Sequence, residues 1–218
     1  MDTIAVIDFE TTGLSPAEGD RATEIAAVLV RDGQIVDRYE SLMNAGQRVP
    51  PFIEQLTGIT TAMVRRAPPA EQVMTEVAAF VGNSPLVAHN AAFDSKFWDA
   101  ELGRIGRKRG QAFICTLLLA RRVLPQAPSY KLGALVESAG LPTAARAHRA
   151  LADAEMAAHL MLYLERELIQ RFRLNAVSHD LLGRIQKTPK SQLHGCVTRY
   201  GDLAHDAAET GRMPRARS

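Results

Sequence analysis

The stretch IAVIDFETTGL, residues 4–14, begins with four apolar residues and runs directly into two acids, Asp8 and Glu10. A short apolar run of this kind is typical of a buried β-strand. Successive side chains of a strand alternate between its faces, so Asp8 and Glu10 project from the same side of the sheet. Because burying two unpaired carboxylates is costly, either the pair is solvated or something positive lies between them. Hard divalent cations prefer such oxygen ligands. The stretch therefore favours a metal site at the end of a buried strand.

Length and composition indicate an ordinary globular domain. The 218 residues are 46% hydrophobic, and no apolar run approaches the ~20 residues that a membrane span needs. The N-terminus lacks the basic and apolar regions of a secretion signal. The only cysteines, Cys115 and Cys196, indicate reduced thiols and no disulfide framework. We therefore expect one sizeable core, a cytoplasmic location and no membrane partner.

The formal net charge of +2 is unevenly distributed, because residues 1–164 carry −2 and residues 165–218 carry +4. So small a net charge does not decide whether the partner is a nucleic acid. Basic groups that could bind phosphates are Arg65-Arg66, Arg121-Arg122 and the set Arg104, Arg107, Lys108 and Arg109. A charge run is more often a solvated face, so these groups leave the partner open.

The order of the expected elements predicts the fold class. A second apolar run, residues 23–31, ends at Asp32-Gly33, a strong hairpin signal, so residues 34–43 should return antiparallel. Further short strands are expected over 86–88 and 113–115. Periodic spacing predicts helices over 50–56, 70–81, 92–105, 116–123, 132–139 and 150–170. Hairpin strands followed by strand–helix units predict an α/β fold with a mixed five-stranded sheet and helices on both faces.

Two further acids and a histidine can complete the acidic site. Asp94 falls in the first turn of the helix expected over 92–105, and Asp153 falls near the start of the helix expected over 150–170. Five helical residues turn through about 500°, so His148 and Asp153 cannot share a face of one regular helix. They converge only if His148 lies in a loop before the helix. An imidazole in that place is suited to take a proton from water.

Four ordered segments resemble the motifs of the DEDDh 3′-to-5′ exonucleases: DFETTGL (8–14), LTGI (56–59), HNAAFD (89–94) and HRALAD (148–153). The residues of these motifs are most similar to those of the exonuclease domain of the bacterial DNA polymerase III epsilon subunit. The resemblance covers about residues 3–165 and implies a ribonuclease H-like fold. We expect residues 1–170 to form the exonuclease domain. Residues 171–218 are expected to form a C-terminal helical extension, with short helices over 181–186 and 192–197 and a flexible basic end at Thr210–Ser218.

The resemblance implies a role for each site residue. Asp8, Glu10, Asp94 and Asp153 would bind two Mg²⁺ or Mn²⁺ ions, with Asp8 bridging them, and His148 would be the general base. Two ions about 3.5–4 Å apart stabilise both the attacking and the leaving oxygen of a phosphodiester. The residues implied to bind the terminal nucleotide are Thr11, Thr12, Gly13, Leu14, Leu56, Thr57, His89 and Phe93. His89 is expected to be a structural hydrogen-bonding residue just outside the metal ligands.

The expected activity is hydrolysis of a single-stranded or frayed 3′ end to nucleoside monophosphates. DNA is favoured, in proofreading or repair, whereas RNA trimming by the same family is an alternative because no residue decides how closely the pocket fits a 2′-hydroxyl. An inactive nucleic-acid or polymerase-binding module is a second alternative, but all five site residues are present. A phosphotransferase of the haloacid dehalogenase type would need aspartate in place of Glu10 and has no use for residues 148–153. Nothing in residues 171–218 identifies a polymerase-binding peptide, so a polymerase partner stays open.

Overall fold

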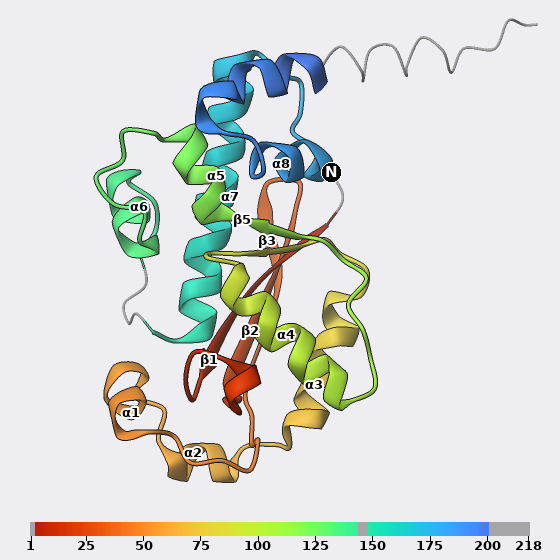
Figure 1. The fold of residues 1–218 in the computed structure, drawn as a ribbon, viewed down its shortest axis with the longest axis vertical. Coiled ribbons are helices and arrows are strands. Elements are labelled where there is room, and N and C mark those ends of the chain that lie inside the picture. Colours follow the sequence, from red (N-terminus) through yellow and green to blue (C-terminus); the bar gives the residue numbers. More distant parts are fainter. Residues whose placement is uncertain (1–2, 144–147, 201–218) are drawn as a thin grey trace, which may run out of the picture.

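The computed structural model describes residues 3–143 and 148–200, which are arranged around a single sheet (Figure 1). The five strands lie in the spatial order β3-β2-β1-β4-β5. The first three pair antiparallel, whereas β1, β4 and β5 pair parallel. Their bounds are β1 Ile4–Thr11, β2 Ala22–Arg31, β3 Gln34–Leu42, β4 Leu86–Ala88 and β5 Phe113–Cys115. The structure confirms the predicted α/β fold with a mixed five-stranded sheet.

Strand β1 lies at the centre of the sheet and carries the acids of the opening stretch. It extends to Thr11, beyond the apolar run that predicted it, so Glu10 is part of the strand. Val6 packs in the core on the side of α7, whereas Ile7 packs in the core on the opposite face. Because side chains alternate along a strand, Asp8 and Glu10 project toward the side of Val6. This confirms that the two carboxylates share one face.

The predicted hairpin joins β2 to β3. Asp32 and Gly33 form its turn with φ values of 51° and 77°. Both values lie in the left-handed region, as a two-residue turn of type I′ requires, and glycine adopts it without a steric penalty. The Asp32-Gly33 signal was therefore sufficient to predict this connection.

Helices cover both faces of the sheet. One face packs against α3 and α4 around a core that includes Ile25, Val77 and Phe97. The other face packs against the long helix α7, with α5, α6 and α8 beside it, around a core that includes Val28 and Leu164. The bounds are α3 Ala70–Val81, α4 Ala92–Arg104, α5 Thr116–Val123, α6 Leu132–Ser138, α7 Ala150–Phe172 and α8 His179–Ile185. Among the described residues, no helix combines the length and the apolar character that crossing a membrane demands.

The segment between β3 and α3 forms a small unit of its own. Helices α1 (Pro51–Thr57) and α2 (Thr61–Arg66) enclose a separate apolar cluster of Val49, Ile53, Ile59 and Val64. Helix α2 is absent from the predicted elements, because six residues are too few for an apolar period to be recognised. Its start is fixed locally, since the Thr60 hydroxyl accepts a hydrogen bond from the Met63 amide at 3.2 Å.

The C-terminal segment contains the two short helices that the sequence predicts. They are α8 and residues 193–200, which follow a 3₁₀ turn at Lys190–Gln192. Leu181, Ile185, Leu193 and Val197 are buried in the same core as α7. Helix α7 itself continues to Phe172, so the domain division at residue 170 stays a prediction. The predicted flexible end, Thr210–Ser218, lies outside the described residues.

Candidate active site

The acids of β1 meet the start of α7. Ligand atoms of Glu10, His148 and Asp153 all lie within 4.8 Å of one another. Glu10 comes from the end of the central strand, His148 from the chain just before α7, and Asp153 from the first turn of α7. The sheet and the helix thus bring together residues that are far apart in the sequence. Asp8 and Asp94 are not part of this closely spaced group.

Asp94 approaches the same place from α4. Its side chain is 2% exposed, and its Oδ1 accepts a hydrogen bond from the Phe9 amide at 3.2 Å. Phe9 follows Asp8 in the strand, so this bond places the Asp94 carboxylate against the backbone of β1. Burial and the neighbouring charges of Asp94, Asp153 and Glu10 raise the pKa of Asp8. The predicted carboxylates therefore gather at one end of β1.

The pKa values of this cluster show the cost of gathering acids away from water. Burial, followed by the charges of Asp153 and Glu24, raises the pKa of Glu10 to about 8, although Arg149 opposes the shift. Burial raises the pKa of Asp94 to about 7 and also raises that of Asp153. Each shift reflects a penalty on the charged form. The donor set of carboxylate oxygens fits Mg²⁺ or Mn²⁺, whose charge would remove that penalty.

We expect the stability of the metal-free protein to fall as pH rises. The folded protein keeps protons on Glu10 and Asp94 up to about pH 8 and 7, whereas the unfolded chain releases them near pH 4 to 5. Folding is therefore weakened between about pH 5 and 8. Thermal unfolding in EDTA should show a decreasing Tm across this range, and Mn²⁺ should raise Tm more at pH 8 than at pH 5. A Tm in EDTA that increases across the range would contradict the raised pKa values.

His148 lies outside α7, as the sequence predicts. The helix begins at Ala150, and the His148 backbone has a φ of 61°, in the left-handed region. A histidine in this conformation is held there by its surroundings, because the region carries a steric cost for residues other than glycine. The side chain is exposed to solvent beside the carboxylates. The preceding residues 144–147, where the sequence predicts a loop, lie outside the described residues.

A buried glutamate that the sequence analysis missed holds this turn. Glu24, on β2, is 2% exposed and lies opposite Glu10 in the sheet. Its carboxylate accepts hydrogen bonds from the Arg149 guanidinium, with Nε at 3.1 Å from both oxygens, and from the Ala150 amide at 3.0 Å. It thereby satisfies an unpaired N–H at the start of α7. A lone acid in the otherwise apolar run of β2 was the signal that could have revealed it.

The residues expected to bind the terminal nucleotide divide into two groups. Several use their polar atoms within the protein: the Thr11 hydroxyl donates to the Gly13 carbonyl at 2.6 Å, and the Thr57 hydroxyl donates to the Ile53 carbonyl at 2.9 Å. Leu14 and Leu56, by contrast, are 78% and 52% exposed. Phe93 is partly buried and packs against Phe97. Phe52, four residues before Leu56 on α1, is 64% exposed and was missed, although the i, i+4 spacing could have indicated it.

Both ring nitrogens of His89 contact protein groups. Nδ1 lies 2.9 Å from the Thr116 hydroxyl, and Nε2 lies 3.0 Å from the Tyr130 carbonyl. Burial lowers the pKa of this imidazole. His89 thus ties the end of β4 to the start of α5 and to the loop before α6. These contacts are the structural hydrogen bonding that the sequence analysis expected of it.

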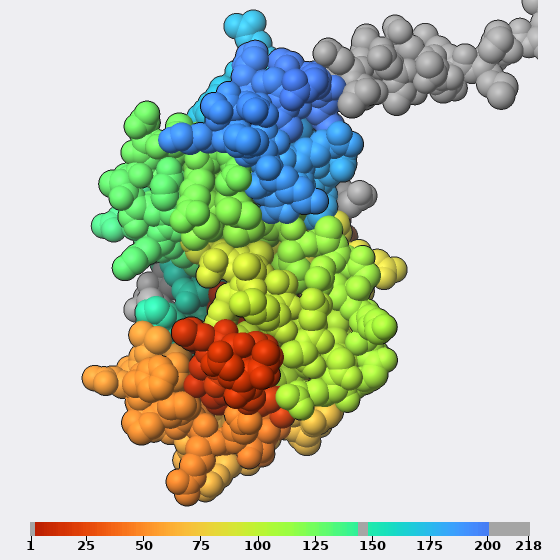
Figure 2. All heavy atoms as spheres, viewed as in Figure 1, coloured from red at the N-terminus to blue at the C-terminus, as the bar shows by residue number. Residues whose placement is uncertain are grey.

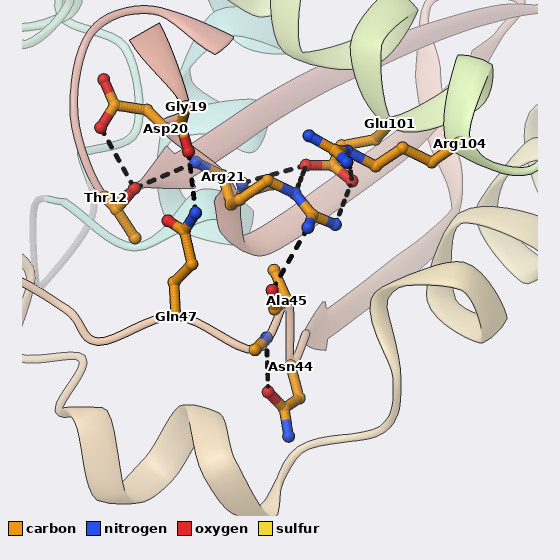
Figure 3. A network of polar contacts seen from close by, with 11 residues as sticks. Thr12, Gly19, Asp20, Arg21, Asn44, Ala45, Gln47, Glu101 and Arg104 are labelled. Carbon is orange, nitrogen blue, oxygen red and sulfur yellow. Dashed lines mark hydrogen bonds and ion pairs between the residues drawn. The ribbon is translucent and has the colours of Figure 1, made fainter.

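The loop after β1 is anchored by a second buried ion pair (Figure 3). Arg21 donates to both oxygens of Glu101, at 2.7 and 2.9 Å, and to the Ala45 carbonyl at 3.2 Å. The Arg21 amide donates to the Thr12 hydroxyl at 3.0 Å. The Glu101 carboxylate is 2% exposed and belongs to α4, the helix that also carries Asp94. The pair therefore joins the TTGL loop to α4.

Gly13 permits this loop to close on itself. A Cβ at this position would clash with the Asp20 carboxylate. The same carboxylate accepts hydrogen bonds from the Ser15 amide at 3.0 Å and from the Thr12 hydroxyl at 3.4 Å. The glycine thus leaves room for a side chain of the same loop.

Comparison with known proteins gives consistent matches. A family model for RNase_T, described as exonuclease, matches residues 5–161. The chain is 40% identical over 169 residues to the 3′-5′ exonuclease DinG of Bacillus subtilis strain 168, covering 77% of this chain and 18% of that protein. It is 39% identical over 171 residues to a PolC-type DNA polymerase III of Oceanobacillus iheyensis, covering 78% of this chain and 12% of the polymerase. The chain thus spans less than a fifth of the length of these relatives.

Solved structures agree in fold. A structure of exonuclease X in complex with 5′ overhanging duplex DNA matches with a TM-score of 0.66 and 29% identity, covering 84% of this chain and 99% of that chain. Escherichia coli exonuclease I in complex with a dT13 oligonucleotide matches with a TM-score of 0.68 and 17% identity, over 79% of this chain and 43% of that one, which shows the fold alone. These matches confirm the resemblance to the DEDDh exonucleases and the nuclease assignment. The chain belongs to the RNase_T family of exonucleases.

Proposed function

We propose that this chain is a metal-dependent 3′-to-5′ exonuclease that removes nucleoside monophosphates from nucleic acid. The observation that carries the proposal is the convergence of four acids from three elements, with an exposed histidine beside them. Asp8, Glu10, Asp94 and Asp153 would hold two Mg²⁺ or Mn²⁺ ions. When bound, such ions polarise the phosphoryl oxygens and stabilise the leaving 3′-oxygen.

The protein groups then have separable tasks. His148 is positioned to accept the proton of the attacking water, because its ring is exposed and lies within 4.8 Å of two of the metal-binding carboxylates. The exposed Leu14 and Leu56 offer apolar surface to the terminal base, which carries little sequence information. Thr12 and Gly13 belong to the loop that carries Leu14. The expected reaction is therefore independent of base sequence.

DNA is the substrate that the relatives favour. Exonuclease X is described in complex with duplex DNA, and the PolC-type relatives are named as DNA polymerases. Trimming of RNA is the second candidate, because the same fold includes a 3′-exonuclease described as recognising histone mRNA. Action together with a polymerase is supported only by the names of the PolC-type relatives. Proofreading is thus the narrower form of the proposal, and DNA degradation from the 3′ end is the broader one.

The proposal is tested with matched single-stranded DNA and RNA oligomers that carry a 5′ label. Incubation with Mn²⁺ or Mg²⁺ should give a ladder that shortens from the 3′ end, and EDTA or Asp8→Ala should abolish it. A faster ladder on RNA would transfer the assignment to RNA trimming. If neither polymer is shortened with either metal, the exonuclease proposal fails and the inactive binding module is the interpretation that remains.

Glu24→Gln should lower kcat by about ten- to a hundredfold, because the Arg149 side chain loses the charge that holds the turn at His148. The side-chain oxygen of the glutamine can still accept the hydrogen bond from the Ala150 backbone amide. The readout is hydrolysis of thymidine 5′-monophosphate p-nitrophenyl ester, which needs only the catalytic groups.

Glu101→Gln is the matched control, since Glu101 is equally buried and also holds an arginine and a backbone amide. Both variants should lower Tm, but only Glu24→Gln should slow cleavage of the ester. Equal slowing by the two variants would mean that Glu24 acts on folding alone.

A further inference from the structure

A hollow of about 460 Å³ lies at the end of β4 and β5 that is remote from the acids. Pro85, Gln111 and Ala112, which line it, come just before these two parallel strands, whereas the HNAAFD motif follows β4. The ends of α3 and α4 and the start of α8 complete the lining. In the space-filling view the C-terminal segment, in blue, lies against the green segment that contains β5 (Figure 2). The hollow is therefore separate from the candidate active site.

The lining of this hollow carries positive charge and no acid. Arg107 and Lys108, both exposed, line it, and no aspartate or glutamate does. Among the residues that the structure describes, neither of these cations forms an ion pair with a carboxylate. The other two members of the basic set after α4 are engaged, since Arg104 and Arg109 each pair with an acid of that helix. The hollow thus offers two unpaired cations, which are suited to a phosphate.

The lining also contains apolar groups and two unpaired nitrogens. Its apolar part is formed by Ala78, Pro85, Trp98 and Leu102. Trp98 is 1% exposed, yet its Nε1 has no hydrogen-bond partner among the described residues, and the same is true of Nε2 of His179, which also lines the hollow. Buried polar groups are nearly always hydrogen-bonded, so two such nitrogens at one hollow point to the polar atoms of a ligand.

We propose that this hollow is a second binding site, for a nucleoside monophosphate, in which Arg107 and Lys108 hold the phosphate and the apolar residues contact the base. Such a ligand combines a charged phosphate with a planar base whose edges carry polar atoms, whereas inorganic phosphate would leave the apolar part of the lining without contacts. The volume of about 460 Å³ lies within the range of small-molecule sites, roughly 300–1,000 Å³. The inference rests on the proposed function only for the source of the ligand, because hydrolysis from a 3′ end releases such monophosphates.

Part of the hollow belongs to the C-terminal segment of this chain. His179 lies beyond residues 5–161, the part that the family model matches. Helix α8, which carries His179, is fixed beside β5 by the Gln186 side chain. This side chain accepts a hydrogen bond from the Cys115 amide at 2.8 Å and donates one to the Phe113 carbonyl at 2.9 Å. A lining fixed in this way reduces the entropy lost on binding a ligand.

Fluorescence provides a direct test, because Trp98 is the only tryptophan of the chain. Thymidine 5′-monophosphate is added in EDTA, which removes the divalent ions that the candidate active site would need, and the indole is excited where thymine absorbs little. The emission should change to saturation, and calorimetric titration should give the same Kd. Arg107→Ala and Lys108→Ala should each raise this Kd about tenfold, because each removes a charge-assisted contact to the phosphate. Thymidine and inorganic phosphate, which each lack one part of the ligand, should bind at least about tenfold more weakly.

Two further variants separate the hollow from surface charge in general. Arg66→Ala removes an exposed arginine of α2 that does not line the hollow, so it should keep the wild-type Kd. Ala78→Phe keeps both cations but adds a ring at a partly buried position of α3 that lines the hollow, so it should raise the Kd at least about tenfold. The Tm of each variant is measured to show that it is folded.

The outcomes distinguish this inference from the proposed function, because 3′-end hydrolysis is measured separately with Mn²⁺. If the wild type hydrolyses a labelled strand but does not bind thymidine 5′-monophosphate in EDTA, the second site is refuted and the proposed function stands. If the nucleotide binds but no strand is hydrolysed, the second site stands and the proposed function fails. Inorganic phosphate that binds as tightly as the nucleotide would mean that the cations hold an adventitious ion only. A Kd that is the same in Arg107→Ala, Lys108→Ala and Arg66→Ala, or that Ala78→Phe leaves unchanged, would also overturn the assignment.

Discussion

Replacing Asp153 by asparagine is expected to lower the rate of 3′-end hydrolysis by at least about a thousandfold. The Asp153 carboxylate is partly buried and lies within 4.8 Å of ligand atoms of Glu10 and His148. Asparagine keeps the size of the side chain but removes the negative charge that would hold a divalent ion. The measurement is the initial rate on a 5′-labelled single-stranded DNA with saturating Mn²⁺. Calorimetric titration should show weaker Mn²⁺ binding by the same variant.

Glu155→Gln is the matched control for Asp153→Asn. Glu155 lies on the same helix, two residues further on, but its carboxylate pairs with Arg38 on β3 at 2.5 Å. The loss of this partly exposed pair should cost little stability and leave hydrolysis close to the wild-type rate. Full activity in Asp153→Asn would end the interpretation of these carboxylates as a metal site.

His148→Ala is expected to lower kcat by about a hundred- to ten-thousandfold while leaving Mn²⁺ affinity close to that of the wild type. The imidazole lies beside the carboxylates, on a turn outside α7, where it can accept a proton from water without being needed to hold the helix. The measurement combines single-turnover hydrolysis with calorimetric titration of Mn²⁺. Added imidazole should restore part of the lost rate, because it supplies the missing base.

His159→Ala serves as the control for His148→Ala. His159 lies on α7, nine residues beyond Ala150, where it lines a different hollow beside Leu162 and Glu165. Its removal should leave kcat unchanged. If His148→Ala instead loses Mn²⁺ affinity and does not respond to imidazole, His148 is a metal ligand and not the base.

The two buried ion pairs near the site, Glu24–Arg149 and Glu101–Arg21, have different expected consequences for catalysis. Glu24 holds Arg149 and Ala150 next to His148, whereas Glu101 holds Arg21 and Ala22 beside the loop after β1. Both are buried carboxylates paired with arginine, and breaking one such pair typically costs about 3–5 kcal/mol of stability. Measuring both Tm and ester hydrolysis for the two variants therefore separates a loss of folding from a loss of positioning.

Local patterns were enough to predict most of the fold, whereas the members of the acidic cluster were implied by the resemblance to the DEDDh exonucleases. Asp32-Gly33 specifies its hairpin through φ values that few residue pairs adopt. The alternation of a strand places Asp8 and Glu10 on one face, and the period of a helix excludes His148 from α7. These inferences depend on neighbours in the chain, so no knowledge of the fold was required. Helix α2 was missed because six residues carry too little periodicity.

Tertiary structure alone decided which distant side chains meet. Glu24 and Arg149 are 125 residues apart, and Arg21 and Glu101 are 80 residues apart. No spacing rule of a strand or helix relates such positions, because their pairing depends on how α4 and α7 cross the sheet. The same is true of His89, whose ring nitrogens meet Thr116 and Tyr130 across the fold. The sequence by itself determined the acids, the histidine and the order of the elements, whereas the packing of helices on the sheet decided what holds these residues in place.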